Sequence, residues 1–292
     1  MQVALLYATI VLIWGSTWFA ITFQLGPVAE EISVVYRFGL ASIALFAFAA
    51  LSGRRVRIPL NRYGHVVLMG ILLYSVNYML VYHGTSYLTS GLVAVIFSLI
   101  ILFNAFFERL IFKRPFEVRM MVASILGLGG IVCLFWPEVS EFNLGDRTIF
   151  GALLVITSVV IASLGNMVAI VNTAKDLPVT AVNAHGMAWG ALSSLIIAVF
   201  MGHRLEFSTD PAYLTSLLYL AVAGSAIAFG AYLALLRIIG SARAAYTSVL
   251  FPIVALLIST VFEGYRWTLP AFIGVLLIVV GNWLALTRIN GE

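Results

Sequence analysis

Residues 84–108 read GTSYLTSGLVAVIFSLIILFNAFFE, and residues 240–263 read GSARAAYTSVLFPIVALLISTVFE. Each stretch is an apolar run long enough for a helix to cross the ~30 Å hydrocarbon core of a bilayer. When the glutamates that end the two stretches are aligned, Phe97 falls on Pro252. The two stretches therefore predict equivalent membrane spans, one in each half of the chain.

The composition of the whole chain extends this prediction to a membrane protein without a soluble domain. Hydrophobic residues make up 62% of the 292 positions, charged residues make up 10%, and the mean hydropathy is +1.08. A soluble domain is roughly half apolar and a quarter charged, so the excess apolar surface must face lipid. The net charge is only +4, and the basic residues lie in short loops beside apolar runs. We therefore expect a lipid bilayer, and not nucleic acid, as the surrounding partner.

Apolar runs of spanning length occur ten times, and helices are the open-chain structures that satisfy backbone polar groups in hydrocarbon. No connection exceeds about a dozen residues, and the N-terminal run lacks a basic leader and a cleavage motif, so it is a first span and not a signal peptide. The sequence thus predicts an all-α integral membrane protein with ten transmembrane helices. The expected spans are 3–24, 30–51, 63–84, 88–108, 117–136, 148–173, 179–201, 212–236, 243–262 and 267–287.

The distribution of Lys and Arg predicts the orientation. With a cytoplasmic N-terminus, twelve of the sixteen basic residues fall in inner loops or the tail and three fall in outer loops, while Arg37 lies within a span. This excess matches the positive-inside rule, so we expect both termini in the cytoplasm. The inner residues are Arg54, Arg55, Arg57, Arg62, Arg109, Lys113, Arg114, Arg119, Lys175, Arg237, Arg243 and Arg288, and the outer ones are Arg147, Arg204 and Arg266.

The two halves of the chain resemble each other beyond the opening pair of stretches. Shortening the loop after Glu108 by four residues places Gly130 on Gly281. Residues 1–146 and 147–292 then form two five-helix repeats, and an odd number of spans gives the second repeat an inverted topology. Inverted repeats are typical of secondary transporters, because two similar halves give inward-open and outward-open states of comparable energy. A duplicated packing unit without transport is the alternative.

Three local motifs resemble the EamA-type members of the drug/metabolite transporter superfamily. They are Trp14-Gly15-Ser16, the end of the fourth span at Glu108, and Tyr246 with Pro252 and Glu263 in the ninth span. The likeness is closest to the amino-acid exporters, including those for aromatic amino acids. It implies a monomeric carrier in the bacterial inner membrane that exports amino acids and similar metabolites without a cofactor. The chain departs from a symmetric pattern at Phe97, so the hinge proline Pro252 occurs only once.

Polar and ionisable groups at membrane depth are costly and are therefore candidates for function. Arg37 lies about 10 Å into the second span, where it either meets a substrate carboxylate or extends its side chain to the interface. His185 lies at comparable depth in the seventh span and is either a hydrogen-bonded packing residue or a proton carrier. The predicted substrate-binding residues are Trp14, Ser16, Thr17, Arg37, Asn77, Tyr78, Tyr82, His83, Asn104, Asn166, His185, Tyr232 and Tyr246.

Several of these residues also have a structural interpretation. Ser16 and Thr17 fit close helix packing as well as a pathway lining. Tyr82, His83 and Tyr246 lie near span ends, where aromatic side chains form interfacial belts. Together the candidates predict a mostly apolar cavity with hydroxyls, amides and aromatic faces, which suits amphipathic solutes of amino-acid size. We expect the first, third, fourth, sixth, eighth and ninth spans to line it, and the fifth and tenth to pack away from it.

The mechanism predicted from these residues is passive or weakly coupled export by alternating access. No Asp or Glu lies in the middle of a span, which removes the usual carboxylate proton relay. Pro252 breaks a backbone hydrogen bond and allows the ninth span to bend. The alternative function is a membrane-embedded enzyme acting on a lipid-soluble substrate. It lacks support because no H-E-x-x-H, G-x-S-x-G or Walker A motif occurs, and we expect no catalytic residue and no metal site.

Overall fold

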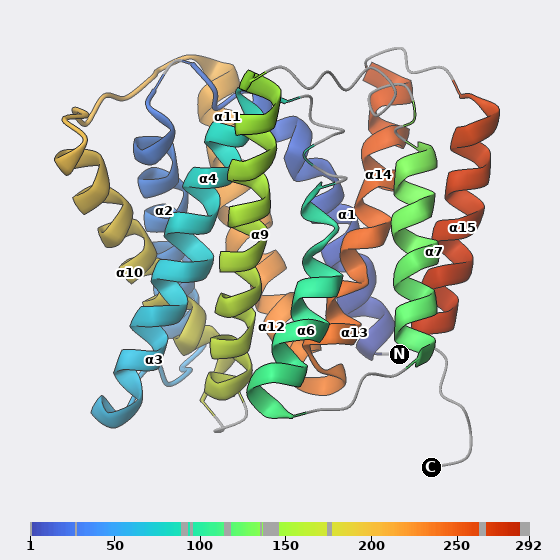
Figure 1. Ribbon diagram of the computed structural model, residues 1–292. Coiled ribbons are helices and arrows are strands. Elements are labelled where there is room, and N and C mark those ends of the chain that lie inside the picture. Colours follow the sequence, from blue (N-terminus) through green and yellow to red (C-terminus); the bar gives the residue numbers. More distant parts are fainter. Residues whose placement is uncertain are drawn as a thin grey trace.

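The computed structural model describes residues 2–26, 28–88, 93, 96–113, 118–134, 136, 146–173, 177–262 and 267–286 (Figure 1). All regular elements within these ranges are helices, which confirms the all-α prediction. They are α1 (Gln2–Thr22), α2 (Glu30–Leu51), α3 (Leu60–Ile71), η1 (Leu72–Val76), α4 (Asn77–Thr85), α6 (Ile100–Phe112), α7 (Val118–Leu134), α9 (Asp146–Thr173), α10 (Val179–Phe200), α11 (Pro211–Ala221), η2 (Val222–Ile227), α12 (Ala228–Ile239), α13 (Ser241–Ala245), α14 (Thr247–Phe262) and α15 (Leu269–Leu286).

Six continuous helical segments within the described residues are long and apolar enough to cross a bilayer: Gln2–Thr22, Glu30–Leu51, Leu60–Thr85, Arg147–Asn172, Val179–Phe200 and Pro211–Ile239. Val118–Leu134, Arg243–Ile258 and Leu269–Ala285 are shorter apolar helices. The predicted span 88–108 is described only in part, chiefly as the start of α6. Glu263 and most of the predicted outer loop at 137–147 lie outside the described residues. The multi-pass membrane fold is confirmed, and the count of ten spans stays a prediction.

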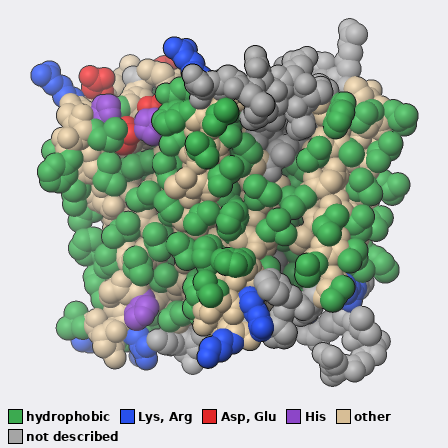
Figure 2. Space-filling view, in the orientation of Figure 1, with side chains coloured by type: hydrophobic (Ala, Val, Ile, Leu, Met, Phe, Trp, Pro, Cys, Tyr) green, Lys and Arg blue, Asp and Glu red, His purple; other side chains and the backbone are tan. Residues whose placement is uncertain are grey.

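The helices run side by side in one bundle, with α2 and α10 at one edge and α7 and α15 at the other (Figure 1). On the face that Figure 2 shows, the side chains in the middle are almost all hydrophobic, whereas charged side chains gather at the two ends. On the face shown, Asp and Glu lie at the upper end, and most Lys and Arg lie at the lower end (Figure 2). This distribution matches a protein whose belt is covered by lipid and whose ends meet water.

The α7–α15 pair depends on glycine at the points of contact. A Cβ added to Gly130 would lie 2.7 Å from the Gly274 carbonyl oxygen, and one added to Gly281 would lie 2.9 Å from the Ala123 carbonyl oxygen. Without side chains at these positions the two backbones approach closely, as is common between membrane helices. The pair therefore forms a closely packed edge of the bundle.

A similar close approach joins the span Leu60–Thr85 to α10. A Cβ on Gly70 would lie 2.3 Å from the Gly186 carbonyl oxygen. On the other side of α10, the Ser42 hydroxyl of α2 donates to the Ala184 carbonyl at 2.8 Å. Both contacts hold α10 against helices of the first half of the chain.

Two spans contain a π-helical turn near the middle. In Leu60–Thr85 the turn is η1, and in Pro211–Ile239 it is η2. A π turn widens the helix by one residue and leaves backbone groups available to side chains from neighbouring helices. Neither turn was predicted from the sequence, and both lie beside the cavity described below.

Candidate substrate cavity

A cavity of about 80 Å³ lies among α1, α2, η1, α4, α6, α9, α12, α13 and α14. All six spans that were predicted to line the cavity contribute to its walls. Helix α2 also contributes, through Arg37. None of the described residues that line it belongs to α7 or α15. Most lining side chains are apolar or aromatic. The predicted site residues among them are Trp14, Thr17, Arg37, Asn77, Tyr78, Asn166 and Tyr232.

Arg37 carries the only charge on the described part of the cavity wall, and its side chain is 1% exposed. The interpretation that it extends to the interface is therefore wrong. Its Nε donates to the Ser225 hydroxyl at 3.0 Å, and its Nη1 donates to the Tyr82 hydroxyl at 3.3 Å. The guanidinium carbon lies 4.6 Å from the centre of the Tyr78 ring, within cation–π range.

The partners of Arg37 are neutral. Among the residues that the structure describes, no carboxylate forms an ion pair with it. Burying a charge costs several kcal/mol unless it is paired, and two hydroxyls and an aromatic face offset only part of that cost. The guanidinium has five N–H donors in a planar fork that matches a carboxylate. An anionic group in the cavity would complete the pairing.

Trp14 forms an aromatic wall of the cavity. The centre of its ring lies 4.8 Å from that of Phe229, 5.1 Å from that of Tyr232 and 5.7 Å from that of Phe251. The indole Nε1 donates to the Gly224 carbonyl at 2.9 Å. These contacts fix the indole, so Trp14 presents a rigid amphipathic surface.

Residues of the two π turns supply hydrogen-bond acceptors at the cavity. The Gly224 carbonyl, which accepts from Trp14, and the Ser225 hydroxyl, which accepts from Arg37, both belong to η2. Asn77 follows η1 directly, and its Nδ2 donates to the Leu73 carbonyl within that turn at 3.3 Å. The turns thus place polar contacts at mid-depth in the bundle, where a regular helix satisfies its own carbonyls.

Side-chain amides join α9 to its neighbours behind the cavity. The Asn77 Oδ1 accepts from the Ser158 hydroxyl at 2.6 Å. The Asn104 Oδ1 accepts from the Ser163 hydroxyl at 2.7 Å and from the Asn166 Nδ2 at 3.3 Å. Asn166 reaches the cavity, whereas Asn104 lies behind it and positions Asn166.

Besides Asn104, five predicted site residues lie away from the cavity wall. Ser16 is directed to the other side of α1, where its hydroxyl is hydrogen-bonded to the Tyr219 hydroxyl. His185 is hydrogen-bonded to the Tyr63 hydroxyl at 3.2 Å and to the Val56 carbonyl at 2.9 Å. Both of its ring nitrogens thus have partners, which supports its interpretation as a packing residue.

The other three are Tyr246, His83 and Tyr82. Tyr246 is fully buried, and its hydroxyl contacts the Ser124 hydroxyl at 2.7 Å and donates to the Met120 carbonyl at 2.6 Å. It therefore anchors the start of α14 to α7 and is not part of an interfacial belt. His83 lies in the last turn of α4 and contacts the Glu31 carboxylate. Tyr82 is also buried and is not a belt residue, since it supports Arg37 from outside the wall.

Several lining residues were missed from the sequence, among them Trp18, Phe97, Phe229, Thr247, Ser248 and Phe251. Most are apolar and differ in no way from lipid-facing residues in the sequence. Ser225, the partner of Arg37, was also missed, although Gly224-Ser225 is a small polar pair in the middle of a span.

Three comparisons relate the chain to known proteins. The EamA-like transporter family matches residues 1–136 and 149–287. The chain is 29% identical to the uncharacterized inner membrane transporter YedA of Escherichia coli K12, over 94% of this chain and 89% of that protein. It is 23% identical to the uncharacterized transporter YdfC of Bacillus subtilis, over 99% and 92% of the two chains. A solved crystal structure shares the fold with a TM-score of 0.78 at 19% identity, covering 97% of this chain and 96% of that one.

Proposed function

Since the chain belongs to the EamA-like transporter family and is a multi-pass membrane transporter, we propose that it exports amino acids and related small carboxylates. Transport proceeds by alternating access of two inverted five-helix halves, residues 1–146 and 147–292. It is passive or weakly coupled, and both termini lie in the cytoplasm.

The observation that carries the substrate class is the state of Arg37. A buried guanidinium faces the cavity with hydroxyl and aromatic partners and without a carboxylate among the described residues. A solute carboxylate supplies the missing charge, and the aromatic wall around Trp14 accepts an apolar side chain. Amino acids combine these two features.

The packing at the α7–α15 edge supports inverted halves. The alignment that places Gly130 on Gly281 also places Ala123 on Gly274. The contact of Gly130 with Gly274 therefore corresponds to the contact of Gly281 with Ala123, as two-fold symmetry requires. The π turns η1 and η2 occur in the third and eighth spans, which are equivalent in this alignment. The two stretches matched by the family coincide with the two halves.

The acidic groups near the cavity support weak coupling. None of the described residues that line the cavity is an Asp or Glu. Glu108 is buried at the end of α6, where it accepts a hydrogen bond from the Ser241 backbone N–H at 3.1 Å and so joins the two halves below the cavity. A carboxylate held in this way has a structural partner and does not face the substrate.

The cavity hydroxyls do not favour the enzyme alternative. Thr17 donates to the Trp14 carbonyl and Ser248 donates to the Ala245 carbonyl, both at 2.7 Å. No His among the described residues lines the cavity to activate either hydroxyl.

The proposal is tested with purified protein in liposomes and a panel of labelled solutes. The panel pairs each amino acid with the amine that lacks its carboxylate. We expect the amino acids, and not the amines, to equilibrate down their own gradients without an imposed proton gradient. Equal transport of the amines would contradict the role of Arg37. Accumulation that collapses with a protonophore would contradict passive transport.

The orientation is tested by cysteine labelling in a Cys133→Ser background. Arg55→Cys lies in the predicted inner loop after α2, and Leu205→Cys lies in the predicted outer loop after α10. We expect an impermeant maleimide added to intact cells to label position 205 alone. Labelling of both positions, or of position 55 alone, would contradict the proposed topology.

A further inference from the structure

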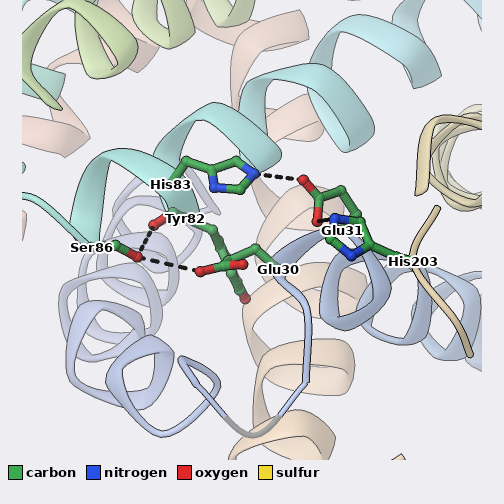
Figure 3. A network of polar contacts seen from close by, with 6 residues as sticks. All are labelled: Glu30, Glu31, Tyr82, His83, Ser86 and His203. Carbon is green, nitrogen blue, oxygen red and sulfur yellow. Dashed lines mark hydrogen bonds and ion pairs between the residues drawn. The ribbon is translucent and has the colours of Figure 1, made fainter. Parts of the chain in front are cut away.

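A second group of ionisable side chains lies at the upper end of the bundle, apart from the cavity. Glu30 and Glu31 occupy the first turn of α2, His83 occupies the last turn of α4, and His203 follows α10 (Figure 3). Acidic side chains and two histidines gather at this end of the molecule (Figure 2). Neither the aromatic wall nor Arg37 uses these residues.

The side chains converge on the carboxylate of Glu31. The His83 Nε2 lies 2.5 Å from Glu31 Oε1, and the His203 Nε2 lies 3.5 Å from Glu31 Oε2. One ligand atom from each of Glu30, Glu31 and His83 lies within 4.8 Å of the other two. Figure 3 shows both imidazole rings directed at Glu31.

The burial of Glu31 marks this group as incomplete. Its side chain is 1% exposed, and its Oε2 is buried without a hydrogen bond. A buried carboxylate oxygen that lacks a hydrogen bond is costly. His83 and His203 are 34% and 37% exposed, so a small cation has access to the carboxylate from solution.

The flanking residues hold the ligand atoms in place. The Ser86 hydroxyl donates to Glu30 Oε1 at 3.3 Å. Gly202 adopts φ +82° after α10, and the backbone N–H groups of Gly202 and His203 donate to the carbonyls of Val199 and Ala198. This closure of the helix end fixes the backbone of His203 next to α2. Oriented ligands of this kind are a usual feature of metal sites.

We propose that Glu30, Glu31, His83 and His203 form a binding site for a divalent transition metal of the Zn²⁺ class. Imidazole nitrogen and carboxylate oxygen are ligands that Zn²⁺ accepts, and tetrahedral bonds of about 2.1 Å place ligand atoms about 3.4 Å apart. The ligand atoms of Glu30, Glu31 and His83 lie within 4.8 Å of one another, so they need shifts of about 1 Å to reach this spacing. His203 reaches the same Glu31 carboxylate at 3.5 Å. Ca²⁺ and Mg²⁺ prefer sites made of oxygen alone, so two imidazoles disfavour them.

The bound metal adds a direct link between three elements at this end of the bundle. It links the start of α2 to the end of α4 and to the segment after α10. Glu31 lies six residues before Arg37, about 9 Å along α2, so the metal is not in contact with the transported solute. The inference is therefore independent of the substrate proposed above.

The test uses full-length protein in detergent micelles, freed of any histidine tag, and Zn²⁺ alone as the probe in isothermal titration calorimetry. We expect one saturable Zn²⁺ site per chain, and Mg²⁺ at the same concentration should not compete. His83→Gln and Glu31→Gln should each weaken Zn²⁺ binding at least tenfold. His65→Gln is the matched control, because His65 is an exposed histidine on the same span.

A second measurement keeps the test valid if Glu31→Gln reduces the yield of folded protein. Co²⁺ bound to wild-type protein should show visible absorption of a four-coordinate site, and His83→Gln should remove it without changing the circular dichroism. The proposal would be overturned if wild-type protein showed no saturable Zn²⁺ binding. It would also be overturned if Zn²⁺ bound with equal affinity to wild type, His83→Gln and Glu31→Gln, and the group would then be an ion pair only.

Discussion

Helix α2 buries two opposite charges, and they differ in how they are satisfied. Glu31 and Arg37 are each 1% exposed, yet they do not pair with each other. They are six positions apart, which places their side chains about 120° apart around the helix axis and about 9 Å apart along it. Glu31 faces two imidazoles from other elements, whereas Arg37 faces hydroxyls and an aromatic ring.

The difference in partners indicates a different function for each of the two charges. A carboxylate between imidazoles is held by groups of the protein and gains from a bound cation. A guanidinium among neutral groups at a cavity remains short of an anion. We infer that Glu31 stabilises the upper end of the bundle and that Arg37 binds substrate, so substitutions at the two positions should affect different measurements.

The largest effect is expected for Arg37→Gln. The variant loses the charge that pairs with a solute carboxylate, and a buried charged hydrogen bond is worth about 2–5 kcal/mol. Transport in liposomes, as kcat/KM, should fall at least about 30-fold while the amount of folded protein on size exclusion stays constant. Arg204→Gln, at an exposed loop position, is the control and should transport normally. Equal losses of transport in Arg37→Gln and Arg204→Gln would contradict a specific role of Arg37 in substrate binding.

Glu31→Gln should affect stability more than transport. The amide keeps the size of the side chain but loses the charged hydrogen bond to His83, at a cost of about 1–3 kcal/mol. The melting temperature of the protein in detergent should fall by several degrees, while KM of the remaining folded protein stays within about twofold. A KM that rises as strongly as in Arg37→Gln would show that the two regions act as one site.

A glycine pair on α7 separates the effects of packing from those of charge. A Cβ at Gly130 would lie 2.7 Å from the backbone of α15, whereas a Cβ at its neighbour Gly129 meets nothing within 4 Å. Gly130→Ala should therefore destabilise the protein by about 1–3 kcal/mol, and Gly129→Ala should be neutral or slightly stabilising. Thermal unfolding measures both. Similar melting temperatures for the two variants would show that the α7–α15 contact is not tight.

The smallest effect is expected for the ring beside Arg37. Tyr78→Phe keeps the aromatic face against the guanidinium, so KM should change less than about twofold. Tyr78→Ala removes the face and should raise KM about fivefold to tenfold without loss of folded protein. A larger effect of the Phe variant would assign the function of Tyr78 to its hydroxyl.

The sequence predicted the bounds of a span well where Gly or Pro flanks it. The predicted spans 30–51 and 179–201 agree with α2 and α10 to within one residue, because Pro178, Gly53 and Gly202 flank them. It did not predict η1 and η2, since a π turn depends on contacts with other helices. The predicted hinge Pro252 lies inside α14, and its role in motion stays a prediction.

The sequence predicted which types of residue form the site better than it predicted which of them lie together. Trp14, Arg37, Asn77, Tyr78, Asn166 and Tyr232 meet at one cavity, whereas His185 and Tyr246 serve packing. Depth along a helix follows from residue number, but the face on which a side chain lies depends on partners far away in sequence. For the same reason, the cluster at Glu31 was not foreseen, and no metal site was expected.

The most direct test of the central claim compares binding of one transported amino acid with binding of its carboxamide, in wild type and in Arg37→Gln. The four affinities form a double-mutant cycle that isolates the contact between guanidinium and carboxylate. We expect wild type to prefer the carboxylate about 100-fold and Arg37→Gln to bind the two solutes with equal affinity. A preference that persists in Arg37→Gln would contradict the assignment of Arg37 as the group that binds the substrate carboxylate.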